Sequence, residues 1–163
     1  LMNYRGWAIF IDCDMLCRAD IAKLWALRDF KKSLLCVKHD HYPKTKTKFL
    51  GEIQTKYPKK NWSSLMLFNC EKCKKLTVDY VNRASGLELH QFKWLGSEDE
   101  IGEIDEFGWN FLVDVQELPE SKEKIDQLSL VHWTLGGPWF KNGKNLSVLD
   151  KEWLLARDEA MNF

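Results

Sequence analysis

A run of five apolar residues, Trp7–Ile11, leads directly into two aspartates one residue apart, Asp12 and Asp14. An uninterrupted apolar run of this length is typical of a strand buried on both faces, as in a parallel sheet. Side chains alternate along a strand, so residues two apart point the same way. Ligands of open α/β sheets gather beyond the carboxyl ends of the strands, so the pattern predicts a binding site at these two aspartates.

Two neighbouring carboxylates repel each other unless a proton or a cation lies between them. At roughly 4 Å and an effective dielectric constant of about 20, the repulsion is about 4 kcal/mol. A hard divalent cation removes that cost, and phosphate oxygens commonly complete its coordination shell. We therefore predict a metal–phosphate site at Asp12 and Asp14. The alternative is an ordinary surface turn, where Asp-x-Asp is also common.

Composition bounds the class of protein. The 163 residues are 45% hydrophobic and 29% charged, which indicates one folded domain, 1–163, rather than a disordered chain. Acidic and basic residues balance at 24 each, so nothing in the charge points to nucleic acid. No apolar stretch approaches the roughly 20 residues that span a bilayer. The 8 tryptophans suit either a heavy core or a sugar-binding cleft.

Five cysteines, an odd number, favour a reduced protein and a cytoplasmic location. Cys70 and Cys73 have the spacing of half a zinc site, but no second pair or His-x-His cluster follows.

Periodicity predicts strands alternating with helices. Asp20 and Thr77 lie where helix N-caps are expected, and Gly86 lies where a helix should end. The expected strands are 33–37, 65–68, 109–115 and 129–134, the expected helices are 19–27, 77–85 and 148–161, and 43–60 and 97–108 are expected loops. On the last helix, the residues assigned to the core are Leu149, Trp153, Ala156 and Ala160.

Polar groups gather at the ends of several predicted strands. Besides the two aspartates, these groups are Lys38, His39 and Asp40, then Asn61, Ser63 and Ser64, and lastly His132 before a Gly-Gly-Pro-Trp turn.

With these groups in hand, the chain resembles the glycogenin-like, retaining GT-A glycosyltransferases. Three motifs in the same order carry the resemblance: the Asp-x-Asp after an apolar strand, the segment 61–69 (Asn-Trp-Ser-Ser-Leu-Met-Leu-Phe-Asn), and the segment 132–139 (His-Trp-Thr-Leu-Gly-Gly-Pro-Trp). The resemblance implies an α/β fold with a mostly parallel sheet flanked by helices. It also implies a nucleotide-diphospho-sugar donor, an acceptor still to be identified, and Mn²⁺ or Mg²⁺ held by Asp12, Asp14 and His132.

The resemblance extends to substrate-binding residues. Gly136 and Gly137 would let backbone N–H groups approach a phosphate, and Trp139 would wall the pocket or simply pack under the turn. Asn61 and Ser63 would bind sugar hydroxyls, although Asn61 could equally brace its turn, and His132 could be a structural histidine. Charge and location make Lys38 a further substrate-binding candidate, and Asp40, Glu103 and Asp105 candidates for a catalytic carboxylate.

Two departures from the family matter. The last motif is one residue shorter and has Gly137 near the place of the family's phosphate-binding lysine, for which a lysine of 44–60 or Lys141 would have to substitute. The family's N-terminal strand–helix units, which hold the nucleotide base, have no counterpart here. We therefore expect an incomplete domain, a fragment that binds donor weakly, with an open sheet edge that favours a homodimer.

Two other functions use the same opening. Haloacid-dehalogenase-type phosphatases place a nucleophilic aspartate and an acid/base aspartate after a strand, the roles that Asp12 and Asp14 would take. That class expects Thr or Val where this chain has Leu16. An inactive transferase relic or binding module is the other alternative.

Overall fold

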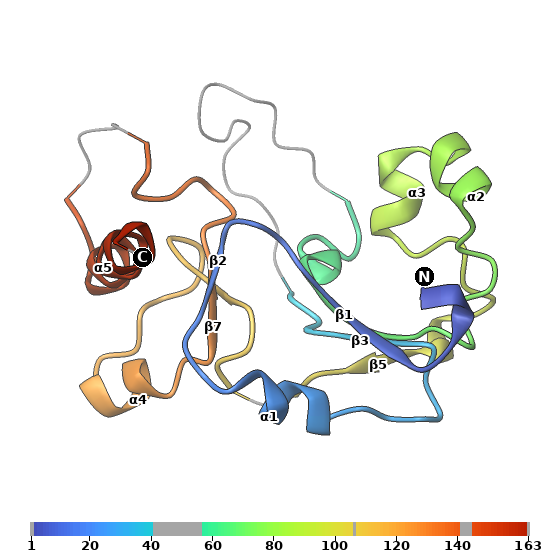
Figure 1. Ribbon diagram of the computed structural model, residues 1–163, viewed down its shortest axis with the longest axis horizontal. Coiled ribbons are helices and arrows are strands. Elements are labelled where there is room, and N and C mark those ends of the chain that lie inside the picture. The colour runs from blue at the N-terminus through green and yellow to red at the C-terminus, as the bar shows by residue number, and fades with distance from the viewer. Residues whose placement is uncertain (1, 41–56, 106, 141–144, 163) are drawn as a thin grey trace.

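The computed structural model describes residues 2–40, 57–105, 107–140 and 145–162. Most of the lysine-rich segment 43–60, and Lys141, lie outside these residues. The strands form two sheets, drawn in Figure 1. The four-stranded sheet has the order β1 (Trp7–Ile11), β4 (Leu65–Asn69), β3 (Leu34–Cys36), β5 (Ile101–Glu103), and the three-stranded sheet has the order β2 (Met15–Cys17), β7 (Leu130–His132), β6 (Phe111–Leu112).

The helices are short except for the last one. They are α1 (Ile21–Ala26), α2 (Val78–Arg83), α3 (Gly86–His90), α4 (Lys122–Asp126) and α5 (Val148–Met161). In Figure 1, α2 and α3 lie beside the four-stranded sheet, and α4 and α5 lie at the other end of the molecule, next to β2 and β7.

The strand β4 is the centre of the larger sheet. All five of its residues are buried, as the apolar run predicts. Met66 and Phe68 face a core that includes Trp94, whereas Leu65 and Leu67 face a second core around Leu24 of α1. The alternation of a strand thus supplies two opposite apolar layers from one segment.

The strand β1 is present where the sequence predicts it, but its burial differs. Among the described residues it pairs only with β4, in antiparallel register, so it is an edge strand. Trp7 is buried, whereas Phe10 is 44% exposed. The expectation of burial on both faces is wrong for β1. An apolar run indicates contact with apolar groups, but it does not reveal how many strands pair with it or whether both of its faces are covered.

The sheets are mixed rather than mostly parallel. Of the five strand pairs in the described residues, β3–β5 and β6–β7 are parallel, while β1–β4, β3–β4 and β2–β7 are antiparallel. The expected parallel character is therefore found in part of the structure only. Strand direction depends on how distant segments connect, which local periodicity does not encode.

One local prediction is wrong. The segment 97–108, expected to be a loop, contains β5, which is only three residues long and too short to show alternation. Gly86 lies past the end of α2, as expected, and it also begins α3, because Ser85 caps α3 with a capping box to Glu88. The N-caps at Asp20 and Thr77 are confirmed.

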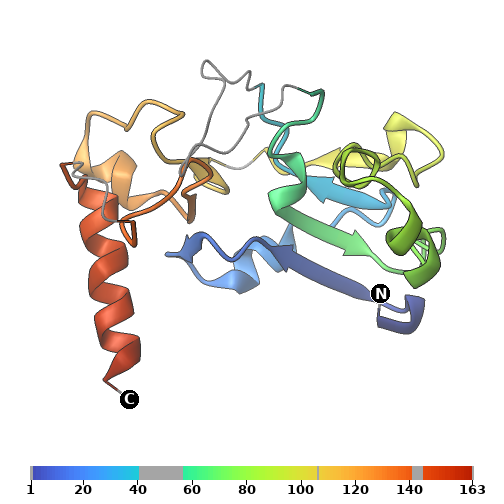
Figure 2. The same cartoon turned by 90° about the horizontal axis from the view of Figure 1, so that it is seen from above.

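The helix α5 is attached to the body through its first turn. Leu149 is buried, but Ala160 is exposed, so the predicted core stripe does not continue along the helix, which projects outward in Figure 2. Asp150 is also buried, and its carboxylate accepts from the Trp133 indole N–H at 2.7 Å and from the Ser147 backbone N–H at 2.8 Å. A buried carboxylate therefore anchors this helix.

At the base of the smaller sheet, the backbone of Gly108 holds the start of β7. Its carbonyl accepts from the N–H groups of Ser129 at 2.9 Å and Leu130 at 3.0 Å. Gly108 has φ +91°, and a Cβ at this position would lie 2.5 Å from the carbonyl oxygen of Gln127. Only glycine fits there without displacing the chain that leads into β7.

We predict that native protein exposes two of its five thiols to alkylation at pH 8. Cys13 and Cys17 are exposed, whereas Cys36, Cys70 and Cys73 are buried, and burial raises the pKa of Cys36 and Cys73 to about 12. The buried groups stay as unreactive thiols until the protein unfolds. Intact-mass measurement of native and denatured samples checks this, and rapid labelling of Cys36 in native protein would contradict the fold. That all five cysteines are free fits the predicted reducing compartment, which stays a prediction.

Candidate metal centre

Three side chains from three segments meet at one point. Asp12 follows β1, Asp14 precedes β2, and His132 ends β7. One ligand atom from each lies within 4.8 Å of the others. Within the described residues, these three side chains form the one cluster of acidic, histidine or cysteine groups that could hold a metal ion. Cys70 and Cys73 are not part of such a cluster.

Backbone pairing brings the three residues together. Met15 of β2 lies opposite His132 of β7 in the antiparallel ladder. The carbonyl of Asp14 accepts from the N–H of Trp133 at 3.0 Å, and the N–H of Asp12 donates to the carbonyl of Ser64 at 2.9 Å. The site therefore lies where the two sheets meet, and it is held by main-chain bonds on both sides.

The His132 ring uses both of its nitrogens. Nε2 lies 3.3 Å from Oδ1 of Asp14, and Nδ1 lies 3.1 Å from Oδ1 of Asn110. His132 and Asn110 are both buried, so their contact is shielded from bulk water, whereas the Asp14 side chain is partly exposed. One nitrogen thus faces a carboxylate and the other a neutral amide.

The electrostatics of the metal-free site are unfavourable for Asp12. The pKa of Asp12 is raised from 3.8 to about 6: burial is the main cause, His132 opposes the rise, and the charge of Asp14 adds to it. Burial penalises the charged form of a carboxyl group, and a like charge adds to the penalty. A bound cation would remove both effects.

The donor set fits a divalent ion that prefers oxygen. Carboxylates suit Mg²⁺ and Mn²⁺, and an imidazole shifts the preference toward Mn²⁺. Mg²⁺–oxygen bonds of about 2.1 Å keep two ligands of one ion within about 4.2 Å of each other. The three ligand atoms, within 4.8 Å of one another, need to close by roughly half an ångström to bind such an ion.

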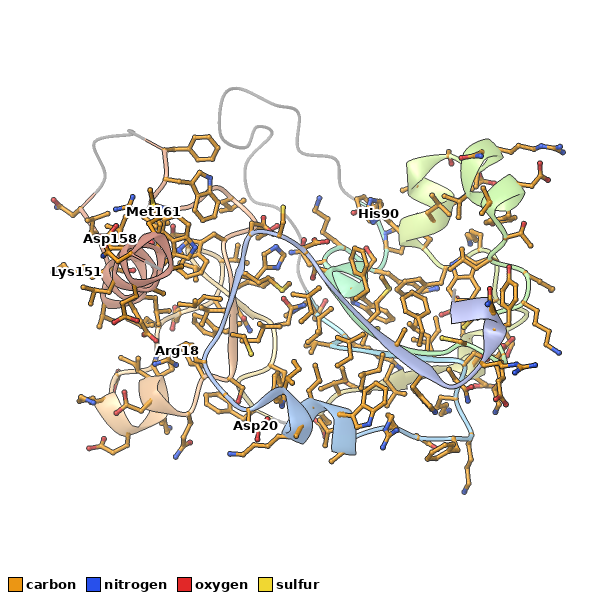
Figure 3. The ribbon with its side chains drawn as sticks, viewed as in Figure 1. Arg18, Asp20, His90, Lys151, Asp158 and Met161 are labelled. Atoms are coloured by element: carbon orange, nitrogen blue, oxygen red, sulfur yellow. The ribbon has the colours of Figure 1, made fainter. Side chains whose placement is uncertain are left out.

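An apolar cavity of about 350 Å³ adjoins Asp12. Its polar lining also includes Ser63 and His90, whose Oγ and Nδ1 atoms are 2.6 Å apart. His90, labelled in Figure 3, is the last residue of α3, and its ring meets the short helix that contains Ser63. Tyr57 is near as well, since burial and the charge of Asp12 both raise the pKa of its phenol. The apolar walls of the cavity come from Phe10, Met66, Phe68, Leu76, Leu89, Phe92 and Trp94.

Asn61 makes structural contacts. It adopts a left-handed conformation with φ 65°, and its carbonyl accepts from the Ser64 hydroxyl at 2.7 Å. Its side-chain oxygen accepts from the Thr134 hydroxyl at 3.2 Å, while its buried Nδ2 has no partner among the described residues. These contacts favour the turn-bracing alternative, and the predicted role in binding sugar stays a prediction.

The Gly-Gly-Pro-Trp turn is filled by its own tryptophan. Trp139 packs against Trp133 and Trp153, with ring centroids 6.2 and 4.9 Å apart. A Cβ on Gly137 would lie 2.2 Å from the Trp139 ring, so this glycine leaves room for the indole. Gly136, with φ 102°, turns the chain and donates its N–H to the carbonyl of Trp133 at 2.8 Å. Packing accounts for both glycines, and phosphate binding stays a prediction.

The predicted catalytic carboxylates lie elsewhere. Asp40 and Asp105 are exposed and line a cavity of about 390 Å³ together with Lys38, Glu103 and Trp109. The lining of this cavity does not include Asp12, Asp14 or His132. The structure thus places the predicted polar residues around two different cavities: Asp12 and Ser63 line one, and Lys38, Asp40 and Asp105 line the other.

Sequence reasoning missed Asn110. Its signal is a single polar residue, between Trp109 and Phe111, inside the apolar run 109–113. A polar side chain at 0% exposure must find hydrogen-bond partners, so this position was a candidate for a buried contact.

The fold of the chain is similar to that of a solved GT-A structure. The fold is shared with LgtC, a GT-A glycosyltransferase known from the crystal structure of an active-site mutant. The TM-score is 0.51 at 12% sequence identity, over 93% of this chain and 61% of that chain. At such low identity the similarity concerns the fold alone.

A sequence relative is Protein CDI of Arabidopsis thaliana, which is 46% identical over 161 residues. The match covers 98% of this chain and 61% of that protein, so the chain spans about three fifths of its relative's length. No protein-family model matches the chain. Within the described residues, each helix is too short or too polar to cross a membrane.

We predict that Asp12→Asn stabilises the metal-free protein at pH 7.5. The folded-state pKa of about 6 exceeds the ordinary value of 3.8, so the folded protein binds more protons between these values and loses stability as pH rises through them. Asparagine removes that penalty and also a metal ligand. The melting temperature without metal should therefore rise, while the increase caused by Mn²⁺ in the original protein should disappear. A lower metal-free melting temperature for Asp12→Asn would contradict this account.

We predict that Gly137→Ala lowers the free energy of unfolding by about 1–3 kcal/mol, because the added methyl group must displace the Trp139 ring. Urea unfolding followed by tryptophan fluorescence measures the change. Gly86→Ala is the control, since a Cβ there meets nothing within 4 Å. Equal stabilities for the two variants would show that the tryptophan packing is not as described.

Proposed function

We propose that the protein is a divalent-metal-dependent glycosyltransferase, which moves a sugar from a nucleotide-diphosphate donor to an acceptor. One observation carries the proposal: Asp12, Asp14 and His132 converge beside the end of β1 in a GT-A-type fold. Their chemistry suits a cation that binds diphosphate oxygens. The similarity to LgtC supports the fold on which such sites are built, and the residues supply the specific argument.

In this proposal the three side chains hold Mn²⁺ or Mg²⁺, which would neutralise the charge of the departing diphosphate. The bond between the sugar's anomeric carbon and the phosphate oxygen breaks. An acceptor hydroxyl forms a new bond to the same carbon, and its proton passes to the departing diphosphate. The contribution of Asp12 and Asp14 is to keep two negative charges close together, at a cost that a cation relieves without protonation of either carboxylate.

The finer assignments rest on the family resemblance. We propose glycogenin-like, retaining chemistry, with Ser63 facing the donor from the cavity beside Asp12. Asn61, Lys38, Gly136, Gly137 and Trp139 remain proposed contributors to substrate binding. For a catalytic carboxylate, Asp40 and Asp105 remain candidates, in a cavity whose tryptophan and charged lining suits a polyhydroxylated acceptor.

The other two functions have less support. A haloacid-dehalogenase-type phosphatase would use Asp12 as a nucleophile, and neither the GT-A-type fold nor the contact between Asp14 and His132 favours that use. An inactive relic would keep the metal site and lose turnover. Hydrolysis of a phosphate substrate would therefore favour the phosphatase, and metal binding without sugar transfer would favour the inactive relic.

The test is a thermal-shift titration of the full-length protein with Mn²⁺ and UDP- or GDP-sugars. We expect Mn²⁺ with the correct donor to raise the melting temperature by several degrees, because ligands that bind only the folded state stabilise it. Asp14→Ala should abolish the rise, because it removes one of three metal ligands.

The matched control is Asp126→Ala, which removes an exposed carboxylate whose partner is Lys122 on α4. This variant should keep the full metal- and donor-dependent shift. If no nucleotide sugar binds in a metal-dependent way, the transferase proposal fails. Hydrolysis of an aryl phosphate that is lost in Asp12→Asn would favour the phosphatase instead.

A further inference from the structure

A fully buried carboxamide lies against the side of His132 that faces away from the carboxylates. Asn110 is 0% exposed, and its Oδ1 lies 3.1 Å from Nδ1 of His132. The other ring nitrogen, Nε2, lies 3.3 Å from Oδ1 of Asp14. The imidazole therefore connects a neutral amide in the interior with a carboxylate of the candidate metal centre.

The neighbours of Asn110 determine which way its amide points. Its Nδ2 group donates to the hydroxyl oxygen of Ser64 at 2.9 Å. The Ser64 hydroxyl in turn donates its one proton to the carbonyl of Asn61 at 2.7 Å. Because that proton is already used, the Ser64 oxygen can only accept from Asn110. The amide oxygen must then face His132.

An amide oxygen opposite Nδ1 requires a proton on Nδ1, since an oxygen cannot donate. In a neutral ring the second nitrogen then carries a lone pair, and this is the form of histidine that binds a metal. Here that nitrogen faces Asp14. A lone pair and a carboxylate attract each other only when a cation or a proton lies between them, so the hydrogen-bond chain prepares Nε2 for a positive partner.

We propose that Asn110 is a positioning residue: anchored through Ser64 to Asn61, it holds His132 in the Nδ1–H tautomer and presents Nε2 to the divalent cation. The tautomer follows from this structure by itself, whereas its use in metal binding rests on the function proposed above. Asn110 also has φ 56°, a left-handed conformation that asparagine adopts more readily than most residues. Backbone and side chain thus both favour asparagine at this position.

The first test needs no metal. Protein labelled with ¹⁵N-histidine is studied by long-range ¹H–¹⁵N correlation at alkaline pH, and the His132 signals are identified by their loss in His132→Gln. We expect a protonated Nδ1 and an unprotonated Nε2. The opposite tautomer, with the proton on Nε2, would overturn the proposal.

The second test measures Mn²⁺ affinity by calorimetry. Asn110→Leu removes the acceptor, and we expect the Mn²⁺ dissociation constant to rise about 10–100-fold, the usual effect of losing such a partner. Asn110→Asp keeps an oxygen acceptor at the same place and should bind Mn²⁺ at least as well as Asn110 does. Equal losses in the two variants, or no loss in Asn110→Leu, would overturn the proposal.

A stability control separates positioning from general damage. Leu149→Ala opens the packing around Trp133 without touching the amide chain, so it should lower stability and leave both the tautomer and the Mn²⁺ affinity unchanged. A loss of affinity as large as that of Asn110→Leu would overturn the positioning role. If Asn110→Leu does not fold, Ser64→Ala carries the test. The Asn110 amide then keeps only its 3.4 Å contact with the Asn61 carbonyl, so the second tautomer should appear in the spectrum, and an unchanged spectrum would count against the proposal.

The two proposals fail in different ways. If the original protein binds no Mn²⁺ but His132 shows the Nδ1–H tautomer and responds to Ser64→Ala, the proposed function fails and the positioning role stands. If Mn²⁺ binds and the ring carries its proton on Nε2, the positioning role fails and the metal-dependent function stands.

Discussion

The antiparallel pairing of β2 with β7 is the interaction on which the candidate site depends. It places Met15 opposite His132 and joins the Asp14 carbonyl to the Trp133 N–H, so two residues far apart in the chain meet at a fixed distance. The site that results is electrostatically costly, because burial and a neighbouring carboxylate both disfavour the charge on Asp12. Main-chain hydrogen bonds keep these groups together without help from their own charges. Such unfavourable clusters are typical of functional sites, where stability is exchanged for binding.

Much of this site was predictable from the sequence, because its signals are local. The apolar run before Asp12 and the capped start of α2 are read from neighbouring residues, and the family resemblance added His132. Strand direction and edge position were not predictable, since both depend on contacts between distant segments. The strand β5 was missed because three residues show no periodicity. The Asn110 contact was missed because it joins three separate parts of the chain, and the part that holds Asn110 carries no recognisable motif.

Motif resemblance and structural role overlap at several residues. Gly137 and Trp139 belong to the segment that resembles a transferase motif, yet the glycine makes room for the indole and the indole packs between two other tryptophans. Asn61 likewise supports a turn and anchors Ser64. Of the two uses expected for the abundant tryptophans, core packing is directly visible, since Trp7, Trp94, Trp109 and Trp133 are all buried. A family signature can therefore persist for architectural reasons even where it also serves a substrate.

Gly108 connects this architecture to the metal centre. Its carbonyl holds the first residues of β7, and His132 lies at the other end of that three-residue strand. The space for a side chain at position 108 is already occupied by the main chain of Gln127 and Leu128. Any larger residue would displace the chain that leads into β7. The position of His132 beside the two aspartates thus depends on a distant residue that contributes no atoms beyond its backbone.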